Sequence, residues 1–204
     1  ATSSHFATAE RQFRNPLELG TPKTPTAQNT ATAAGAVVLS AQRGQYPSVI
    51  SATPGRVVDF GINDVNNMGA AMAPAAAETI ITHLEDIGQR PEYYDAIITG
   101  DLGIFGSKLL IKYASELGWD LSGVHRDCGM MLYGDNEKMH CGGSGCGCSA
   151  SMLNGFFLPE MIKGNIKRIL FVATGALHSP TSALQGETIP CIAHAIAIEM
   201  GCSI

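Results

Sequence analysis

A run of twelve residues, Met139 to Ala150, holds four glycines, three cysteines and two serines. Glycine accepts positive φ and lets another backbone or a ligand come close. Backbone N–H groups in such a turn, or at the start of a helix, suit anions. The run therefore predicts a tight turn that leads into a helix and forms one wall of a pocket. Small residues are equally typical of a helix packed closely against a sheet, so packing alone is the alternative.

The same run carries possible metal ligands in His140, Cys141, Cys146 and Cys148. Their spacing differs from the usual Cys-x2-Cys zinc knuckle, and closing four ligands within nine residues would be strained. We therefore favour small buried thiols and predict no metal site here. An oxygen-rich stretch at 59–67 lacks the twelve-residue calcium-hand pattern and predicts a turn network.

Composition excludes several classes of function. The 204 residues carry a net charge of −5, so no basic surface for nucleic acid is expected. The longest apolar run, 169–173, is too short to cross a membrane. Six cysteines without disulfide-scaffold density suit reduced thiols. The chain begins at Ala1, and we expect it to be a piece of a longer protein.

The elements that must position the turn alternate between helix and strand. Apolar periodicity and helix start signals predict helices at 2–14, 73–86, 104–117 and 149–162. Strands are predicted at 94–99, 168–173 and 186–199, with a turn entering a buried strand at 30–41 and a hairpin of 49–52 and 56–60 around Pro54-Gly55. The stretch 119–135 is predicted to be a loop. This alternation is typical of a layered α/β protein.

Several long phrases resemble a known family. They are Thr2 to Arg14, Val58 to Ala77, Thr99 to Gly103, Cys141 to Ala150 and Leu170 to Leu177. The element order resembles the C-terminal half of a thiolase fold, as in ketoacyl-ACP synthase III. The phrases more closely resemble the stage V sporulation protein AD family, of which this chain looks like the last three-fifths. The resemblance implies a thiolase-like α/β/α fold with a mixed five-stranded sheet. Residues 1–45 would end the N-terminal half and 46–204 would form the C-terminal half.

The same resemblance implies a function. The family binds dipicolinic acid, or its calcium chelate, for uptake into the developing spore, so calcium is expected only as part of the ligand and no other cofactor. Its implied location is the periphery of the spore inner membrane, beside integral membrane proteins of the dipicolinate channel. A homodimer is a further expectation.

A condensing enzyme of this fold needs a Cys nucleophile and two partners, His-His or His-Asn, from the C-terminal half. By alignment with that pattern, Gly100 and Gly143 stand where the partners would be. Glycine cannot carry a proton, and it enlarges a pocket. We therefore predict a binding protein without catalysis, with a condensing enzyme or a structural subunit of the membrane channel as alternatives. His140 could partly replace a lost partner.

A pyridine dicarboxylate needs donors for two carboxylates and a roomy slot. The predicted ligand-binding residues are Ser3, Ser4, His5, Gly100, Asp101, His140, Gly142, Gly143 and Ser144. Alternatives remain for several of them. Ser3 and Ser4 fit a helix N-cap, Asp101 fits the N-cap of the helix from Ile104, and both histidines fit structural roles.

Overall fold

The computed structural model describes residues 1–5, 23–42, 44–134 and 136–201. Within these residues the strands are β1 (Thr2–Ser4), β2 (Asn29–Thr30), β3 (Ala33–Gly35), β4 (Pro47–Thr53), β5 (Ala96–Thr99), β6 (His125–Asp127), β7 (Gly143–Ser144), β8 (Arg168–Ala176) and β9 (Cys191–Met200). The α-helices are α2 (Met68–Asp86), α3 (Gly103–Glu116), α4 (Cys128–Tyr133), α5 (Cys146–Met152), α6 (Leu158–Ile162) and α7 (Pro180–Leu184). A π-helical turn, η3 (Leu153–Phe157), joins α5 to α6, and single 3-10 turns are η1 (Pro91–Tyr93) and η2 (Glu137–Met139).

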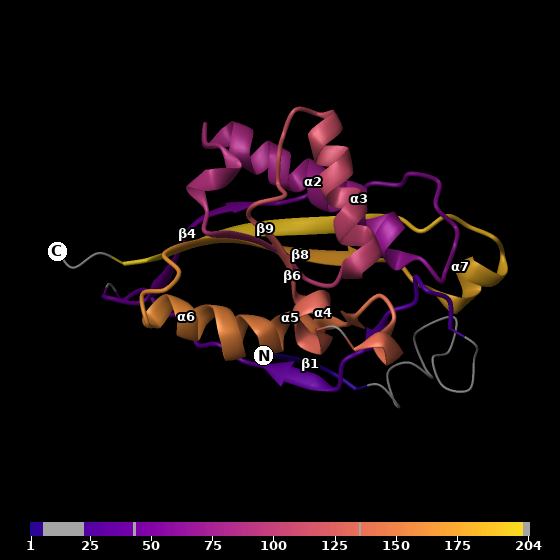
Figure 1. The fold of residues 1–204 in the computed structure, drawn as a ribbon, viewed down its shortest axis with the longest axis horizontal. Coiled ribbons are helices and arrows are strands. Elements are labelled where there is room, and N and C mark those ends of the chain that lie inside the picture. The colour runs from indigo at the N-terminus through magenta and orange to yellow at the C-terminus, as the bar shows by residue number, and fades with distance from the viewer. Residues whose placement is uncertain (6–22, 43, 135, 202–204) are drawn as a thin grey trace.

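A five-stranded sheet of order β4-β9-β8-β5-β6 forms the centre of the molecule (Figure 1). Strand β5 runs parallel to β6 and β8, whereas β9 runs antiparallel to β8 and β4. Helices α2 and α3 lie on one side of this sheet, and α4, α5 and α6 lie on the other (Figure 1). The predicted layered α/β fold with a mixed five-stranded sheet is confirmed.

Alternate residues of the central strands supply two separate cores, because successive strand side chains point to opposite faces. Ile97 and Leu170 pack with α2 and α3, and their neighbours Ile98 and Phe171 pack with the helices on the opposite face. Both faces of the strands are therefore buried. This is why 94–99 and 168–173 are apolar without alternation, and why they could be predicted as strands.

A smaller layer lies beyond α5. Strands β1 and β3 pair in an antiparallel ribbon, and β2 pairs in parallel with β7 (Figure 1). Helix α5 contacts both β1 and β3 on the side away from the central sheet. The N-terminal strands thus hold the Gly/Cys-rich turn from outside the main sheet.

Helix α2 begins earlier than the sequence predicts. Asn67 accepts a hydrogen bond from the N–H of Ala70 at 3.1 Å and caps the helix, which therefore starts at Met68 rather than residue 73. Pro74 lies inside the helix. The absence of a side chain on Gly69 and Gly106 lets α2 and α3 approach closely.

The loop predicted at 119–135 and the hairpin predicted around Pro54-Gly55 are both wrong. The stretch 119–135 contains β6 and α4, because Asp127 ends the strand and caps the helix by accepting the N–H of Met130. Residues 49–52 and 56–60 form no hairpin, since β4 pairs with β9 and only Val58 makes an isolated bridge, to Cys191. Added bulk at Gly55 would overlap the carbonyl of Ala193, and the chain continues alongside β9 from Thr53, which pairs with Ala195, to Val58 instead of turning back.

Predictions near the N-terminus are also corrected. Thr2–Ser4 are strand, not a helix cap, and the rest of the helix predicted at 2–14 lies outside the described residues. The turn predicted to enter a buried strand at 30–41 instead holds the short strand β3, and residues 36–41 have no regular structure. Val38 and Leu39 are 95% and 82% exposed. The helix predicted at 149–162 is found and starts at Cys146.

Among the described residues, no helix has both the length and the apolar character that crossing a membrane requires.

Candidate functional site

The turn after β5 places Asp101 at the meeting point of three elements. Its carboxylate accepts the N–H of Gly145 at 2.9 Å through Oδ2 and the hydroxyl of Thr174 at 2.8 Å through Oδ1. The residue is only 8% exposed. Asp101 therefore ties the end of β5 to β8 and to the start of α5. The alternative interpretation, that Asp101 caps the helix from Ile104, is wrong.

A second buried carboxylate, Asp127, performs that task. Its donors are the hydroxyl of Thr99 and the backbone N–H groups of Leu102, Gly103 and Met130, at 2.8 to 3.0 Å. Burial raises the pKa of Asp127 to about 6, and the charge of Asp101 raises it to a smaller extent. The hydrogen bonds from Thr99 and the backbone act in the opposite direction and lower this pKa. One carboxylate thus satisfies the N-termini of both α3 and α4.

His125 completes this buried chain. Its Nε2 lies 2.9 Å from the Thr99 hydroxyl, which donates to Asp127. The hydroxyl has one proton, so Nε2 of His125 must donate to it. Burial, with a smaller effect of the Arg126 charge, lowers the pKa of His125 to about 4, and the ring is neutral at pH 7.

The Gly/Cys-rich turn uses several of its own donors. The N–H of Gly142 bonds to the carbonyl of Met139, that of Gly145 to Asp101, and that of Gly147 to the hydroxyl of Ser4. Gly143 and Ser144 form β7 and pair with β2. A ligand at this turn would therefore meet donors that already have protein partners.

The two glycines at the expected catalytic positions do not open onto empty space. A Cβ at Gly143 would lie 3.1 Å from the Tyr133 ring and 3.2 Å from Sγ of Cys148. One at Gly100 would lie 3.1 Å from Oγ1 of Thr174 and 3.6 Å from Cβ of Ser149. Close packing, the alternative interpretation, accounts for these contacts.

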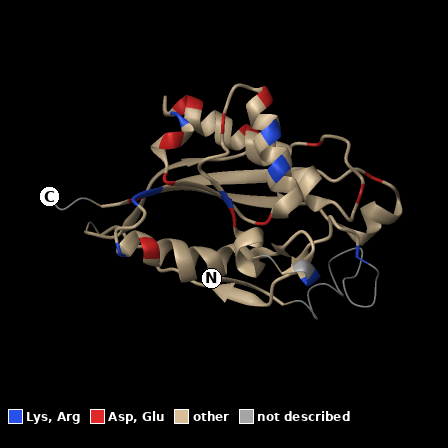
Figure 2. Cartoon of the chain, in the orientation of Figure 1, with Lys and Arg blue, Asp and Glu red and all other residues tan. Residues whose placement is uncertain are grey.

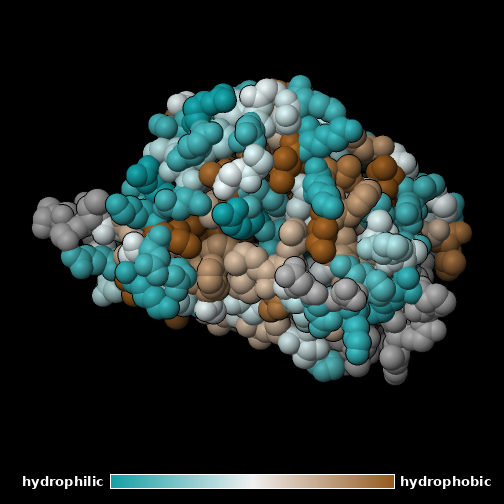
Figure 3. All heavy atoms as spheres, in the orientation of Figure 1, coloured by the Kyte–Doolittle hydropathy of each residue, from teal (hydrophilic) through white to brown (hydrophobic). Residues whose placement is uncertain are grey.

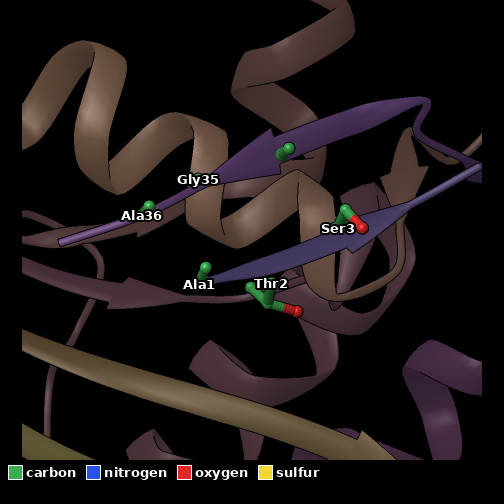
Figure 4. Close-up of a pocket in the computed structure, with 6 residues that line it drawn as sticks. Ala1, Thr2, Ser3, Gly35 and Ala36 are labelled. Atoms are coloured by element: carbon green, nitrogen blue, oxygen red, sulfur yellow. The ribbon is translucent and has the colours of Figure 1, made fainter.

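The predicted N-terminal residues are divided. Ser4 is half-buried and bridges the carbonyl of Ala31, at 2.6 Å, to the N–H of Gly147, at 3.1 Å. Ser3 is exposed and lies beside a shallow depression of about 470 Å³ between β1 and β3 (Figure 4). Its carbonyl accepts from Sγ of Cys146 at 3.2 Å. His5 is exposed.

His140 and the cysteines are not arranged around a common point. His140 is exposed and has a φ of 49°, which is unusual for a residue other than glycine. Cys146 is exposed, whereas Cys141 and Cys148 are buried and burial raises the pKa of both thiols. No group of three or more metal-binding side chains is found in the described part of the chain.

Gln28 joins the two turns from the N-terminal side. Its Nε2 donates to the carbonyl of Asp101 at 2.6 Å and to that of Gly143 at 3.3 Å. The side chain is 3% exposed, and its Oε1 has no hydrogen-bond partner among the described residues.

We call the turns 100–103 and 141–147, with the side chains that bind them, the turn junction. The structure brings together Ser4, Gly100, Asp101, Gly142, Gly143 and Ser144 there, while His5 and His140 are exposed. Sequence reasoning missed Asp127, His125, Thr174 and Gln28. Only Asp127 has a local signal, as a capping residue before Met130 and Met131. The junction presents buried carboxylates and hydroxyls.

Comparison with known proteins gives a clear match. The sequence profile of the family described as stage V sporulation protein AD matches residues 1–199. Stage V sporulation protein AD of Bacillus subtilis (strain 168) is 47% identical over 199 residues, covering 98% of this chain. The chain spans 59% of that relative's length.

Solved structures resemble the chain at low identity. 3-Oxoacyl-[acyl-carrier-protein] synthase III from Aquifex aeolicus VF5 has a TM-score of 0.41 and 14% identity, covering 78% of this chain and 46% of its own. A tetronic acid condensing enzyme, AbyA1, has a TM-score of 0.41 and 16% identity, covering 75% and 47%. MvaS in complex with 3-hydroxy-3-methylglutaryl coenzyme A has a TM-score of 0.42 and 14% identity, covering 78% and 41%.

Proposed function

This chain belongs to the stage V sporulation protein AD family, and we propose that it binds dipicolinic acid, chiefly as its calcium chelate, for uptake into the developing spore. The observation that carries the proposal is the buried Asp101 carboxylate, which lies where both turns and β8 meet. A second buried carboxylate, Asp127, is close enough for its pKa to respond to the Asp101 charge.

The charge of the turn junction selects the form of the ligand. Dipicolinate is a dianion, and two buried carboxylates repel it. The calcium chelate has no net charge, and its cation prefers carboxylate oxygens. Asp101 binds the N–H of Gly145 through Oδ2 and the hydroxyl of Thr174 through Oδ1, which holds its carboxylate at the junction, and carboxylate oxygens are ligands that calcium takes.

We propose that no covalent chemistry accompanies binding. The positions expected to carry a catalytic His and Asn are Gly100 and Gly143, and the side chains packed on them are hydroxyl, thiol and phenol groups. His140, the remaining candidate for a proton carrier, is exposed. Incubation of the full-length protein with an acyl thioester should give no acyl-enzyme by mass spectrometry, and a stable acyl adduct would favour the condensing-enzyme alternative.

The binding proposal is tested by calorimetric titration of the full-length protein with dipicolinate, with and without calcium. We expect affinity for the chelate to exceed affinity for the free dianion by about tenfold or more. Asp101→Asn should remove most of this calcium-dependent gain. Asp59→Asn is the matched control, because Asp59 also accepts one threonine hydroxyl and one backbone N–H but is exposed. No heat with either form of the ligand would refute binding and favour a structural subunit.

We further propose that the protein acts at the periphery of the spore inner membrane, beside integral membrane proteins of the dipicolinate channel, and that it can form a homodimer. Fractionation of spores should place it with the inner membrane and release it with high salt or alkaline carbonate. Recovery in the soluble spore core without such treatment would contradict this location.

A further inference from the structure

A groove on the outer helical layer lies apart from the turn junction. Helices α2 and α3 and the segment before α2 enclose about 330 Å³. The lining residues are Phe60, Ile62, Ala70, Ala73, Pro74, Leu109, Lys112, Tyr113 and Glu116. Its volume is at the lower end of the range for ligand pockets, about 300–1,000 Å³.

The wall made by residues 58–62 is held in place. Val58 and Cys191 exchange two backbone hydrogen bonds of 2.8 Å, and the carbonyl of Ile62 accepts the N–H of Ile189 at 2.8 Å. The ring of Phe60 meets that of Tyr113 edge to face, with centroids 5.9 Å apart. The groove is therefore preformed, although Phe60 is 48% exposed.

The lining chemistry indicates an apolar body with one charged end. Among the described residues that line the groove, the polar side chains besides the Tyr113 hydroxyl are Lys112 and Glu116. Their charged atoms are 4.0 Å apart and both side chains are mostly exposed, so the pair binds weakly and leaves the ammonium available. Lys108, one turn earlier on α3, is exposed and adds a second positive charge.

Charge complementarity then selects the sign of the ligand. The chain as a whole carries a net charge of −5, yet the exposed side of α3 presents two lysines beside apolar surface (Figures 2 and 3). An anionic group is attracted to Lys112 and Lys108, whereas Glu116 is the acidic side chain among the described lining residues. We infer that the groove between α2 and α3 is a second binding site, for an apolar molecule with a single anionic group.

Decanoate is a suitable probe, used with the full-length protein and below its micelle concentration. Titration followed by carboxyl-carbon NMR should show saturable binding, and decylammonium should bind at least about fivefold more weakly. Equal binding of decylammonium would overturn the inferred role of the lysines. Absence of saturable decanoate binding would overturn the site.

Three variants place the probe. Lys112→Gln should lower decanoate affinity about fivefold, and Glu116→Gln should raise it about twofold by removing the nearby carboxylate. Leu109→Trp should block the groove and abolish binding. Lys163→Gln is the matched control, because Lys163 is an exposed lysine paired with Glu160 one turn away. If Lys112→Gln and Leu109→Trp both bind as the parent does, while retaining its melting temperature, decanoate binds elsewhere and the inference is wrong.

Discussion

The turn junction and the α2–α3 groove differ in the side chains they use and in what those side chains do. The junction buries polar groups, and the groove exposes apolar ones. At the turn junction, polar groups from distant parts of the chain are buried and bind one another, as Asp101 binds Gly145 and Thr174. In the groove, apolar side chains such as Phe60 remain partly exposed and leave a preformed space. Polar residues that suggest a reactive site in the sequence can therefore have a structural role, while ordinary apolar residues can line an accessible groove.

The largest effect is expected from adding volume at the turn junction, because the junction is closely packed. A Cβ at Gly147 would overlap the carbonyl of Ala33 and the hydroxyl of Ser4. Gly147→Ala should therefore lower the free energy of unfolding by about 3 kcal/mol, measured by urea denaturation. The matched control is Gly155→Ala, because nothing lies within 4 Å of an added Cβ there. A Gly147→Ala protein as stable as the control would show that the turn is loosely packed.

Removal of the Asp101 carboxylate tests whether the junction depends on its internal hydrogen bonds. Asp101→Ala leaves the N–H of Gly145 and the hydroxyl of Thr174 without their acceptor, and should cost about 2–3 kcal/mol in the same assay. Asp59→Ala removes a matching but exposed acceptor of Thr188 and Gly61, and should cost far less. Equal losses would mean that burial of Asp101 adds nothing to its contribution.

The pH dependence of stability separates the buried acid from the buried base. The pKa of His125 falls from 6.5 to about 4 on folding, so its contribution to stability is complete above pH 6.5 and is lost as the pH falls towards 4. The pKa of Asp127 rises from 3.8 to about 6, so its contribution is complete below pH 3.8 and is lost as the pH rises to 6. The two effects oppose each other between pH 4 and 6.

Single substitutions should expose each effect. Relative to the parent, Asp127→Asn should make stability rise with pH between 4 and 6, and His125→Gln should make it fall, each by up to about 1.4 kcal/mol per pH unit. Urea denaturation at half-unit pH intervals measures both slopes. Parallel curves for the parent and both variants would contradict the assigned pKa shifts.

The smallest effect is expected in the groove. Lys112 and Glu116 form an exposed pair one turn apart, so Lys112→Gln should change the free energy of unfolding by no more than about 0.5 kcal/mol. Thermal melting and urea denaturation would detect a larger loss. A loss comparable with that of Asp101→Ala would mean that the groove, too, is part of the structural framework.

The sequence predicts the buried elements better than the polar ones. Ile80, Ile81 and Leu84 recur at helical spacing and lie in the core, as expected of the helix at 73–86. In contrast, β6 has only three residues, and its buried His125 and Asp127 are accommodated by hydrogen bonds that no local pattern reveals. The apolar residues at 37–41 suggest a buried segment, but they are exposed. Composition shows that a segment is apolar, and not whether another surface covers it.

The candidate site shows the same limit. The sequence locates Asp101 and the Gly/Cys-rich turn, since Asp101 follows a predicted strand and the turn leads into a predicted helix. It does not reveal that Asp101 binds Gly145 rather than the helix that follows it. Gln28 carries no signal at all, because its role depends on the approach of Asp101 and Gly143, which are 73 and 115 residues away in sequence.

The hydrogen bond between Ser4 and Gly147 can form only long after Ser4 has been synthesised. These residues are 143 positions apart, so at about 5–20 residues per second the ribosome adds Gly147 roughly 7–30 s after Ser4. During that interval β1 can pair with β3, but its contact with α5 has to wait. Because Asp101 also binds Thr174, the turn junction is complete only after β8 has been synthesised, and its yield should depend on translation speed and on chaperones that protect the early strands.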